Sequence, residues 1–284
     1  MKLASLKDGR DGRLLVVSDD LGWCISGGEI APSLRAALEN WDRCAPQLRQ
    51  VATFLNSGAP CRRRFEAEAC AAPLPRAYPW ADDAESLEHD DLRRNRLGSE
   101  SCSRFKSVEP DSGFKRSHQA LAGPYDPVLL TGAVPTLAAS VGAAVIVGEA
   151  PRGASRAVAA QAIRLVLLKG AAFAPVAVSP DGLGEAWRDG RLQGVWSVEI
   201  NGLPIGRADP VTVDFAAKVA QAARAGDLAA GTLISAEAGT PHAAVLRPGD
   251  RLRVEMRDAH SRSIFGAVDQ RIEAAPAAME LEVA

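Results

Sequence analysis

The chain is poor in aromatic residues and lacks any strong charge imbalance or long apolar run. Aromatic residues make up 5% of its 284 positions, and the formal net charge is −2 at pH 7. A balance so close to neutral argues against nucleic-acid binding. No apolar run approaches the roughly 20 residues that a membrane helix needs, and the first ten residues lack the apolar core of a signal peptide. We therefore expect a cytoplasmic protein with no membrane partner.

Cysteine is also scarce. The odd number of cysteines and the absence of any C-x-x-C pair argue against both a disulfide framework and a zinc knuckle. We interpret them as reduced, small apolar residues, with one reactive thiol as the alternative. The five cysteines are Cys24, Cys44, Cys61, Cys70 and Cys102.

Hydrophobic residues make up 47% of the chain and charged residues 24%, as is typical of soluble globular proteins. Four prolines between positions 60 and 79 indicate an extended connection, so we predict domains at 1–72 and 73–284. Residues 82–118 are polar with few aliphatic side chains, which favours a flexible loop or an active-site flap. The basic run Arg62–Arg64 is interpreted as a solvated loop, with a phosphate site as the alternative.

Local patterns predict both strands and helices. Residues 1 to about 20 alternate around a Gly-containing turn, which predicts a hairpin. Ser33 is a plausible N-cap for one helix, and Pro46 could open a second that stops near residue 57. Apolar spacing predicts a further helix over residues 155–168.

The C-terminal half is predicted to be rich in strands. Asn201-Gly202 separates two apolar runs, which is a strong hairpin signal. A helix is expected near residues 215–223, and further strands at 252–256 and 263–268.

The order of the C-terminal segments 198–202, 230–235, 246–250 and 254–256 resembles the closing strands of the fumarylacetoacetate hydrolase (FAH) superfamily. Residues 1–18 resemble the small N-terminal domain of one bacterial branch, and residues 73–78 its interdomain segment. The resemblance implies an α+β fold. It would have a mixed β-roll or β-sandwich core, flanking helices and a small N-terminal α+β domain. It also implies a dimer that binds small 2-oxo or β-diketo acids.

The resemblance further implies a metal centre whose ligands this chain lacks. In the superfamily a Mg, Mn or Ca ion chelates the keto-enol oxygens of the substrate and stabilises the enolate leaving group. Two ligands come from a Glu-x-Glu before an apolar strand, and they point to the same side because strand side chains alternate. The matching positions here are Ser140 and Gly142, which carry no carboxylate.

A third ligand normally follows the helix that would end at Leu167–Leu168. In this chain Lys169 follows directly, so that the ligand-bearing segment is predicted to be deleted. We therefore expect no metal cofactor. A rearranged site that uses Glu149, Asp126 or Glu237 is the alternative.

His89 and Asp91 resemble the His-x-Glu pair that activates water in this branch. A carboxylate beside a histidine fixes its tautomer and stabilises the imidazolium, so the pair would be a good base. The alternative is a solvated histidine in a charged loop. The other histidines, His118, His242 and His260, lack metal-ligand spacing and are expected on the surface.

Lys169 resembles the family lysine that binds a substrate carboxylate or oxyanion, although a lysine after a helix also suits the helix dipole. Gly239 and Thr240 resemble the family loop that contacts substrate; as bare sequence Gly-Thr-Pro is simply a turn.

Two functional hypotheses follow. The chain is either a FAH-family protein with residual metal-independent acid–base chemistry, or a catalytically inactive paralogue. In the second case it would bind a ligand or serve as a structural partner, as a homodimer or beside a homologue.

Overall fold

The structure, a computed structural model, describes residues 1–76, 80–83, 114–117, 121–130, 137–138, 141–208, 213–237 and 245–275. Of the residues predicted to form the site, Lys169 and Gly142 are within these ranges. The others, His89, Asp91, Ser140, Gly239 and Thr240, lie outside them.

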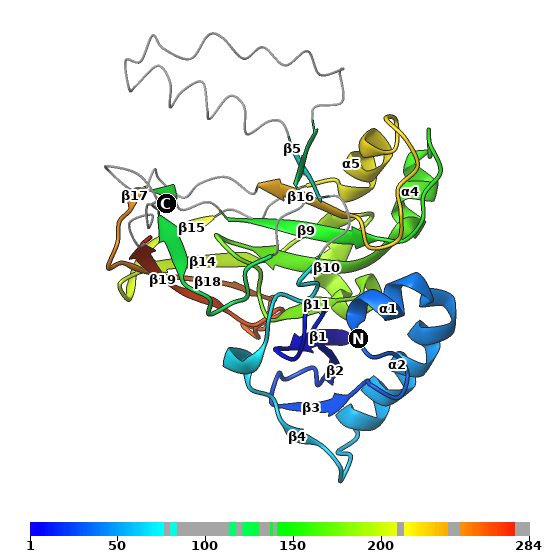
Figure 1. Cartoon of the computed structure of the whole chain (residues 1–284), viewed down its shortest axis with the longest axis horizontal. Helices are drawn as coiled ribbons and strands as arrows, with labels where there is room; N and C mark the ends of the chain where they lie inside the picture. Colours follow the sequence, from blue (N-terminus) through cyan, green and yellow to red (C-terminus); the bar gives the residue numbers. More distant parts are fainter. Residues whose placement is uncertain are drawn as a thin grey trace, which may run out of the picture.

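A ten-stranded sheet runs through the molecule and joins its two parts (Figure 1). Strand β1 of the N-terminal region pairs with β11 of the C-terminal region, so one sheet crosses the predicted boundary at residue 72. In spatial order its strands are β4 (Arg63–Arg64), β3 (Trp23–Ser26), β2 (Arg13–Val17), β1 (Lys2–Leu6), β11 (Val176–Val178), β10 (Ile163–Lys169), β9 (Gly142–Val147), β16 (Leu233–Glu237), β5 (Trp80–Asp83) and β6 (Phe114–Ser117).

A second sheet of five strands packs against the first. Its order is β15 (Leu203–Ala208), β14 (Val195–Ile200), β18 (Arg251–Arg257), β19 (Val268–Ala274) and β7 (Val128–Leu130). Two short pairs complete the strands: β12 (Trp187–Arg188) with β13 (Arg191–Leu192), and β17 (Val245–Leu246) with β8 (Leu137–Ala138). The predicted Asn201-Gly202 hairpin is confirmed, since β14 and β15 pair on either side of it.

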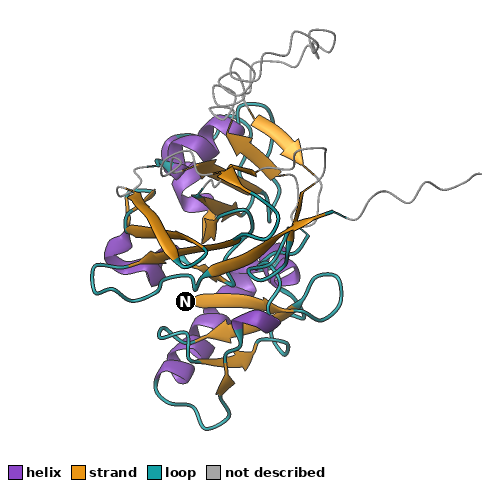
Figure 2. Ribbon diagram, turned by 90° about the vertical axis from the view of Figure 1, so that its left-hand side faces the viewer, coloured by secondary structure: helices purple, strands orange, loops and turns teal. Residues whose placement is uncertain are grey.

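The described α-helices are short apart from α2. They are α1 (Leu34–Glu39), α2 (Trp41–Asn56), α4 (Arg156–Ala162) and α5 (Phe215–Ala222), with 3-10 turns η1 (Ala67–Ala69) and η2 (Pro180–Ala186). In Figure 2 the N-terminal strands and helices form the lower lobe, and strand β1 lies where the lobes meet. None of the helices in the described ranges is long and apolar enough to cross a membrane.

Two apolar layers cover the faces of the long sheet. On one face, α1 and α2 bury Leu34 and Leu48 against residues of β1, β2, β9 and β10. On the other, the five-stranded sheet and helices α4 and α5 enclose a second core around Trp196 and Phe215. This arrangement of mostly sheet with a few helices confirms the predicted α+β class.

The N-terminal elements follow their local sequence closely. The β1–β2 hairpin is confirmed, with Lys2 opposite Val17. Ser33 caps α1 as predicted, because its side chain accepts a hydrogen bond from the N–H of Ala36. Pro46 does not open the second helix: α2 begins at Trp41, because a continuous buried face from Trp41 to Leu55 continues through the proline.

The predicted helix over residues 155–168 is wrong in its second half. Ser155 caps α4, which ends at Ala162, and residues 163–169 form strand β10. A short continuous apolar run fits a buried strand as well as a helix. Here its neighbours β9 and β11 decide the outcome, because they bond to both edges of β10. The predicted strand at 263–268 is similarly displaced, since β19 begins at Val268.

The ends of the predicted loop at 82–118 are strands. β5 and β6 pair antiparallel, with Asp82 opposite Lys115. The remainder of this segment lies outside the described residues.

Candidate functional site

The strands β16, β9 and β10 place their residues in three cross-strand rows on one face. Because directly opposed residues in antiparallel pairs project to the same side, each row is a set of neighbours. The rows are Leu233–Ile146–Leu165, Ser235–Ala144–Leu167 and Glu237–Gly142–Lys169. The first row is wholly apolar and the third is largely polar. The face therefore changes from core to a polar corner where β9 begins.

Gly142 stands at the centre of that corner. It is the first residue of β9, with Lys169 of β10 on one side and Glu237 of β16 on the other. Directly opposed Cα atoms lie about 5 Å apart in such pairs, so Gly142 lies between the positions of Lys169 and Glu237. Lys169 is half-buried.

Two further polar positions adjoin this corner and were missed by the sequence reasoning. Ser235 is fully buried in the middle of β16. Asp82 stands next to Ser235 in the register, because β5 and β16 are parallel neighbours. A signal was available, since a serine inside the apolar run 233–236 is unusual. The pairing with β5, more than 150 positions earlier in the chain, could not be foreseen.

The segment after Lys169 turns back against its own strand. The N–H of Ala174 donates to the carbonyl of Leu168 at 3.1 Å, and Phe173 bridges back to Lys169. The Phe173 side chain is only 3% exposed and belongs to the core on the α1–α2 side. The segment therefore holds Lys169 in place by packing, with its aromatic ring directed into the core.

Pro175 is held by a glycine from another part of the chain. Gly266 has a φ of +76°, and a Cβ atom there would lie 2.7 Å from the Cγ atom of Pro175. A side chain is thus excluded both by conformation and by space. This contact places the end of the Lys169–Pro175 segment against the connection between β18 and β19.

The described donors at this corner do not fit the family metal. Gly142 offers no side chain, and a cationic lysine stands directly opposite it. Of the acids considered for a rearranged site, Asp126 is paired with Lys7 at 2.7 Å and Glu149 is exposed. Within the described ranges no three His, Cys, Asp or Glu side chains gather in a way that could hold a metal ion. The predicted loss of the metal stays a prediction.

The described cysteines and His260 lie away from this corner. The cysteines Cys24, Cys44 and Cys70 are free and buried, whereas Cys61 is free and exposed. Burial raises the pKa of the Cys70 thiol to about 12, which makes it a poor nucleophile. His260 is exposed as predicted.

The basic run is more ordered than the predicted loop. Arg63 and Arg64 form strand β4, which pairs with β3. The guanidinium groups of Arg62 and Arg64 lie 4.3 and 4.5 Å from the centroid of the Trp23 ring. The Trp23 ring explains why the basic run is ordered, because its face attracts both guanidinium groups.

The sequence was compared with protein-family models and with curated proteins. Residues 1–76 match the family model described as fumarylacetoacetase N-terminal domain 2. A search of curated proteins found no match to the sequence.

Solved structures match over nearly the whole chain. A maleylpyruvate hydrolase from Sphingobium sp. SYK-6, in complex with manganese(II) and pyruvate, is 18% identical with a TM-score of 0.64, covering 97% of this chain and 100% of that one. A fumarylacetoacetate hydrolase from psychrophilic Exiguobacterium antarcticum is 14% identical with a TM-score of 0.61, at 97% and 100% coverage. A probable 2-hydroxyhepta-2,4-diene-1,7-dioate isomerase from Mycobacterium abscessus is 14% identical with a TM-score of 0.64, at 98% and 100% coverage.

At these identities the likeness of the structures shows the fold, and the family model covers the N-terminal domain. The fold and the N-terminal domain agree with the resemblance found in the sequence. The chain therefore has the fold of solved fumarylacetoacetate hydrolase structures, and its residues 1–76 match the N-terminal domain of that family.

Proposed function

We propose that the protein takes a small 2-oxo or β-diketo acid at the corner where β16, β9 and β10 meet. One observation carries the proposal: Lys169 and Glu237 both stand directly opposite Gly142. A lysine at this place can bind the carboxylate of such an acid, and a glycine leaves room for it. Among proteins of the same fold, the maleylpyruvate hydrolase structure contains pyruvate, which supports this class of ligand.

We further propose that the reaction proceeds without the family metal. The position of one ligand is Gly142, and a cation bound there would be repelled by Lys169 across the strand pair. The ammonium group could instead stabilise negative charge on the substrate, which is the role that the ion has in the superfamily.

The proposed chemistry uses His89 as base and Asp91 as its partner. His89 would remove a proton from water, and the hydroxide would add to the carbonyl group remote from the 2-oxo acid. The carbon–carbon bond would then break with its electron pair left on an enolate. Lys169 would stabilise that enolate until it takes up a proton. Gly239 and Thr240 are proposed substrate contacts. Tautomerisation or decarboxylation of a 2-oxo acid would need the same base and the same cation.

The second candidate is a catalytically inactive paralogue that binds a ligand or a partner subunit. The same glycine favours it, because a family member that has lost a ligand position has lost the means to polarise the substrate. Under this reading the corner still binds oxo acids, but it does not turn them over. A homodimer or an assembly with a homologue is proposed in both cases.

Calorimetric titration with Mg²⁺ or Mn²⁺ tests the metal-independent proposal. We expect no stoichiometric heat of binding in the absence or presence of pyruvate. Micromolar binding of one ion per chain would contradict it and would point to ligands outside Gly142.

Turnover in the presence of a chelator separates the two functions. Oxaloacetate and an acylpyruvate should be consumed by the wild type, and His89→Ala should abolish the reaction. Lys169→Met should raise KM by at least tenfold, while Lys7→Met is the control for loss of an exposed lysine. Binding of pyruvate without any turnover would favour the inactive paralogue, and neither binding nor turnover would refute both.

A further inference from the structure

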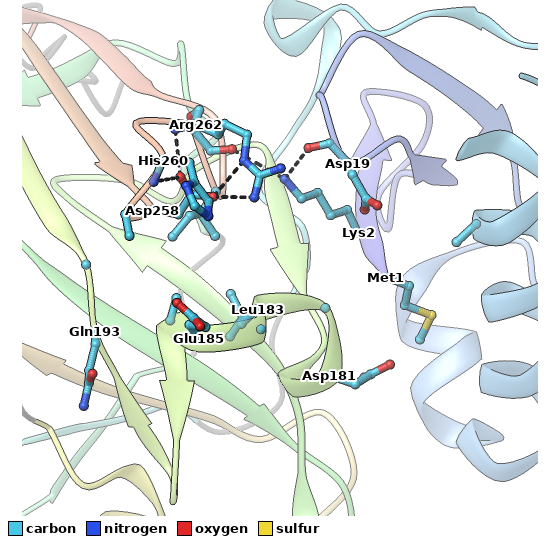
Figure 3. Close-up of a pocket in the computed structure, with 18 of the residues that line it drawn as sticks. Met1, Lys2, Asp19, Asp181, Leu183, Glu185, Gln193, Asp258, His260 and Arg262 are labelled. Atoms are coloured by element: carbon cyan, nitrogen blue, oxygen red, sulfur yellow. Dashed lines mark hydrogen bonds and ion pairs between the residues drawn. The ribbon is translucent and has the colours of Figure 1, made fainter. Parts of the chain in front are cut away.

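A second cleft lies between the N-terminal region and the C-terminal region, away from the β9 corner. It has a volume of about 970 Å³ and is lined by β1, α2, the η2 turn and the loop between β18 and β19. Figure 3 shows the side chains of Lys2, Asp19, Asp258 and Arg262 gathered at one end of it. The two regions contribute opposite walls, so the cleft forms only where they pack against each other.

Lys2 is the notable residue of this cleft. It is 5% exposed, yet its ammonium group bonds only to backbone carbonyls, those of Asp19 at 2.9 Å and Ser263 at 3.5 Å. In the part of the chain that the structure describes, no carboxylate lies within 4.0 Å of the Lys2 Nζ atom. The direct partners of this buried cation are neutral carbonyls and the nearby acids act only at longer range, so burial of its charge is costly and its setting suits an anion in direct contact.

The carboxylates near Lys2 already have partners. Both oxygens of Asp258 accept hydrogen bonds from Arg262, one from its backbone N–H at 2.9 Å and one from its guanidinium at 2.9 Å. Asp19 accepts from the amide of Asn56 at 3.0 Å. Asp258 and one oxygen of Asp19 are therefore engaged by residues other than Lys2.

A hydroxyl group without a hydrogen-bond partner lies beside the lysine. The Ser263 hydroxyl oxygen is buried and has no hydrogen-bond partner among the described residues. Ser263 lines the cleft, and its own carbonyl accepts the weaker hydrogen bond from Lys2. A buried hydroxyl that bonds to nothing is costly. One ligand that accepts hydrogen bonds from both groups would satisfy them together.

We propose that this cleft binds a small monocarboxylate, one of whose oxygens accepts from Lys2 Nζ and the other from Ser263 Oγ. The charges that face Lys2 decide the class of anion: Asp19 and Asp20 from the β2–β3 loop, and Asp258 and Arg262 from the β18–β19 loop. The three acids repel a dianion such as phosphate about twice as strongly as a monoanion, so a single carboxylate suits the one ammonium group better.

The state of the lysine agrees with this assignment. Burial lowers its pKa to about 8, against the opposing effect of Asp19. At pH 7 most of the population is therefore protonated and able to bind an anion. A bound carboxylate favours the charged form, so that it should raise this pKa. The proposal is independent of the proposed function, because the β9 corner contributes no residue to this cleft.

Carbon-13 NMR of the protein labelled at the lysine ε-carbons tests the proposal directly. The sequence contains six lysines, so few signals arise, and Lys2→Met assigns the one from Lys2. Pyruvate is the probe, and sodium chloride at equal ionic strength is the reference. We expect a saturable shift of the Lys2 signal and a rise of its pKa by at least half a unit. Ser263→Ala should weaken the binding that this signal reports at least fivefold, whereas Lys7→Met should leave it unchanged.

Three outcomes would overturn the proposal. One is an absent or non-saturable shift, and another is an equal shift with chloride. The third is tighter binding of inorganic phosphate than of pyruvate, which would contradict the monocarboxylate assignment. Lys169→Met separates the two sites: it should remove pyruvate binding at the β9 corner and leave the Lys2 response intact. If the proposed function fails, the Lys2 signal still reports on the cleft.

Discussion

Lys169 of β10 lies directly opposite Gly142 of β9 in an antiparallel pair. The pairing puts a cation beside a position where the superfamily resemblance implies a carboxylate ligand. Gly142 itself carries no charge, so the corner pairs one lysine and one glutamate position across a glycine where the resemblance implies a further acid. Under the proposed function, Lys169 binds the substrate carboxylate or enolate, which carries the opposite charge.

Restoring the two carboxylates should restore some affinity for metal. We expect Ser140→Glu/Gly142→Glu to bind Mn²⁺ at least tenfold more tightly than the wild type, because carboxylate oxygens are preferred ligands of hard cations. Electron paramagnetic resonance of free Mn²⁺ measures the bound fraction. The glutamine pair Ser140→Gln/Gly142→Gln is the matched control and should not bind. Equal binding by both double variants would contradict the assignment of these positions.

Gly266→Ala should disturb the segment that holds Lys169. The new Cβ atom would lie 2.7 Å from the Cγ atom of Pro175, at a φ of +76° that L-residues rarely adopt. We expect a loss of about 1–3 kcal/mol in the free energy of unfolding, measured by urea denaturation. Gly153→Ala is the control, because its φ is also positive, at +74°, but nothing lies within 4 Å of its Cβ position. Equal losses would show that the contact with Pro175 contributes nothing.

Lys2→Met should stabilise the protein below pH 8, and the gain should shrink as the pH rises. Burial lowers the pKa of Lys2 from 10.5 to about 8, so between these values the unfolded chain binds the proton and the folded chain releases it. The free energy of unfolding of the wild type therefore rises with pH across this window relative to the variant. The full change is about 3 kcal/mol. Urea denaturation at pH 7 and pH 10 measures it, with Lys7→Met as control. A constant difference at both pH values would refute the prediction.

Asp214 both caps helix α5 and forms an ion pair with Arg156, and two substitutions distinguish these contributions to stability. It caps α5 by accepting from the N–H of Ala217 at 3.0 Å, and its other oxygen pairs with Arg156 of α4 at 2.9 Å. We expect Asp214→Ala to cost about 1–2 kcal/mol, chiefly through the lost cap. Asp214→Asn keeps a capping oxygen and should cost less than about 1 kcal/mol, because the pair with Arg156 is exposed. Thermal unfolding compares the two, and equal losses would assign the stability to the ion pair.

The reliable predictions from sequence were those in which the local signal is not contested by distant partners. The β1–β2 hairpin, the Ser33 cap and the turn at Asn201-Gly202 each depend on a few adjacent residues. The errors arose where distant contacts decide. Residues 163–168 became a strand because β9 and β11 flank them, and α2 extends through Pro46 because its apolar face is buried. The candidate site follows the same division: Gly142 and Lys169 were found by resemblance, whereas Ser235 and Asp82 join them only through strand register.

By itself, the sequence determined the α+β class, the N-terminal hairpin and helix cap, and the absence of carboxylates at residues 140 and 142. These properties depend on residue type and short-range spacing. Only the tertiary structure decided that Lys169 faces Gly142, that Gly266 contacts Pro175, and that Lys2 is buried beside Ser263. Each of these pairs is separated by many residues along the chain and is brought together by sheet pairing or by the packing of one region on the other. Such contacts leave no local pattern, because their free energy comes from burial and hydrogen bonding that the folded chain alone provides.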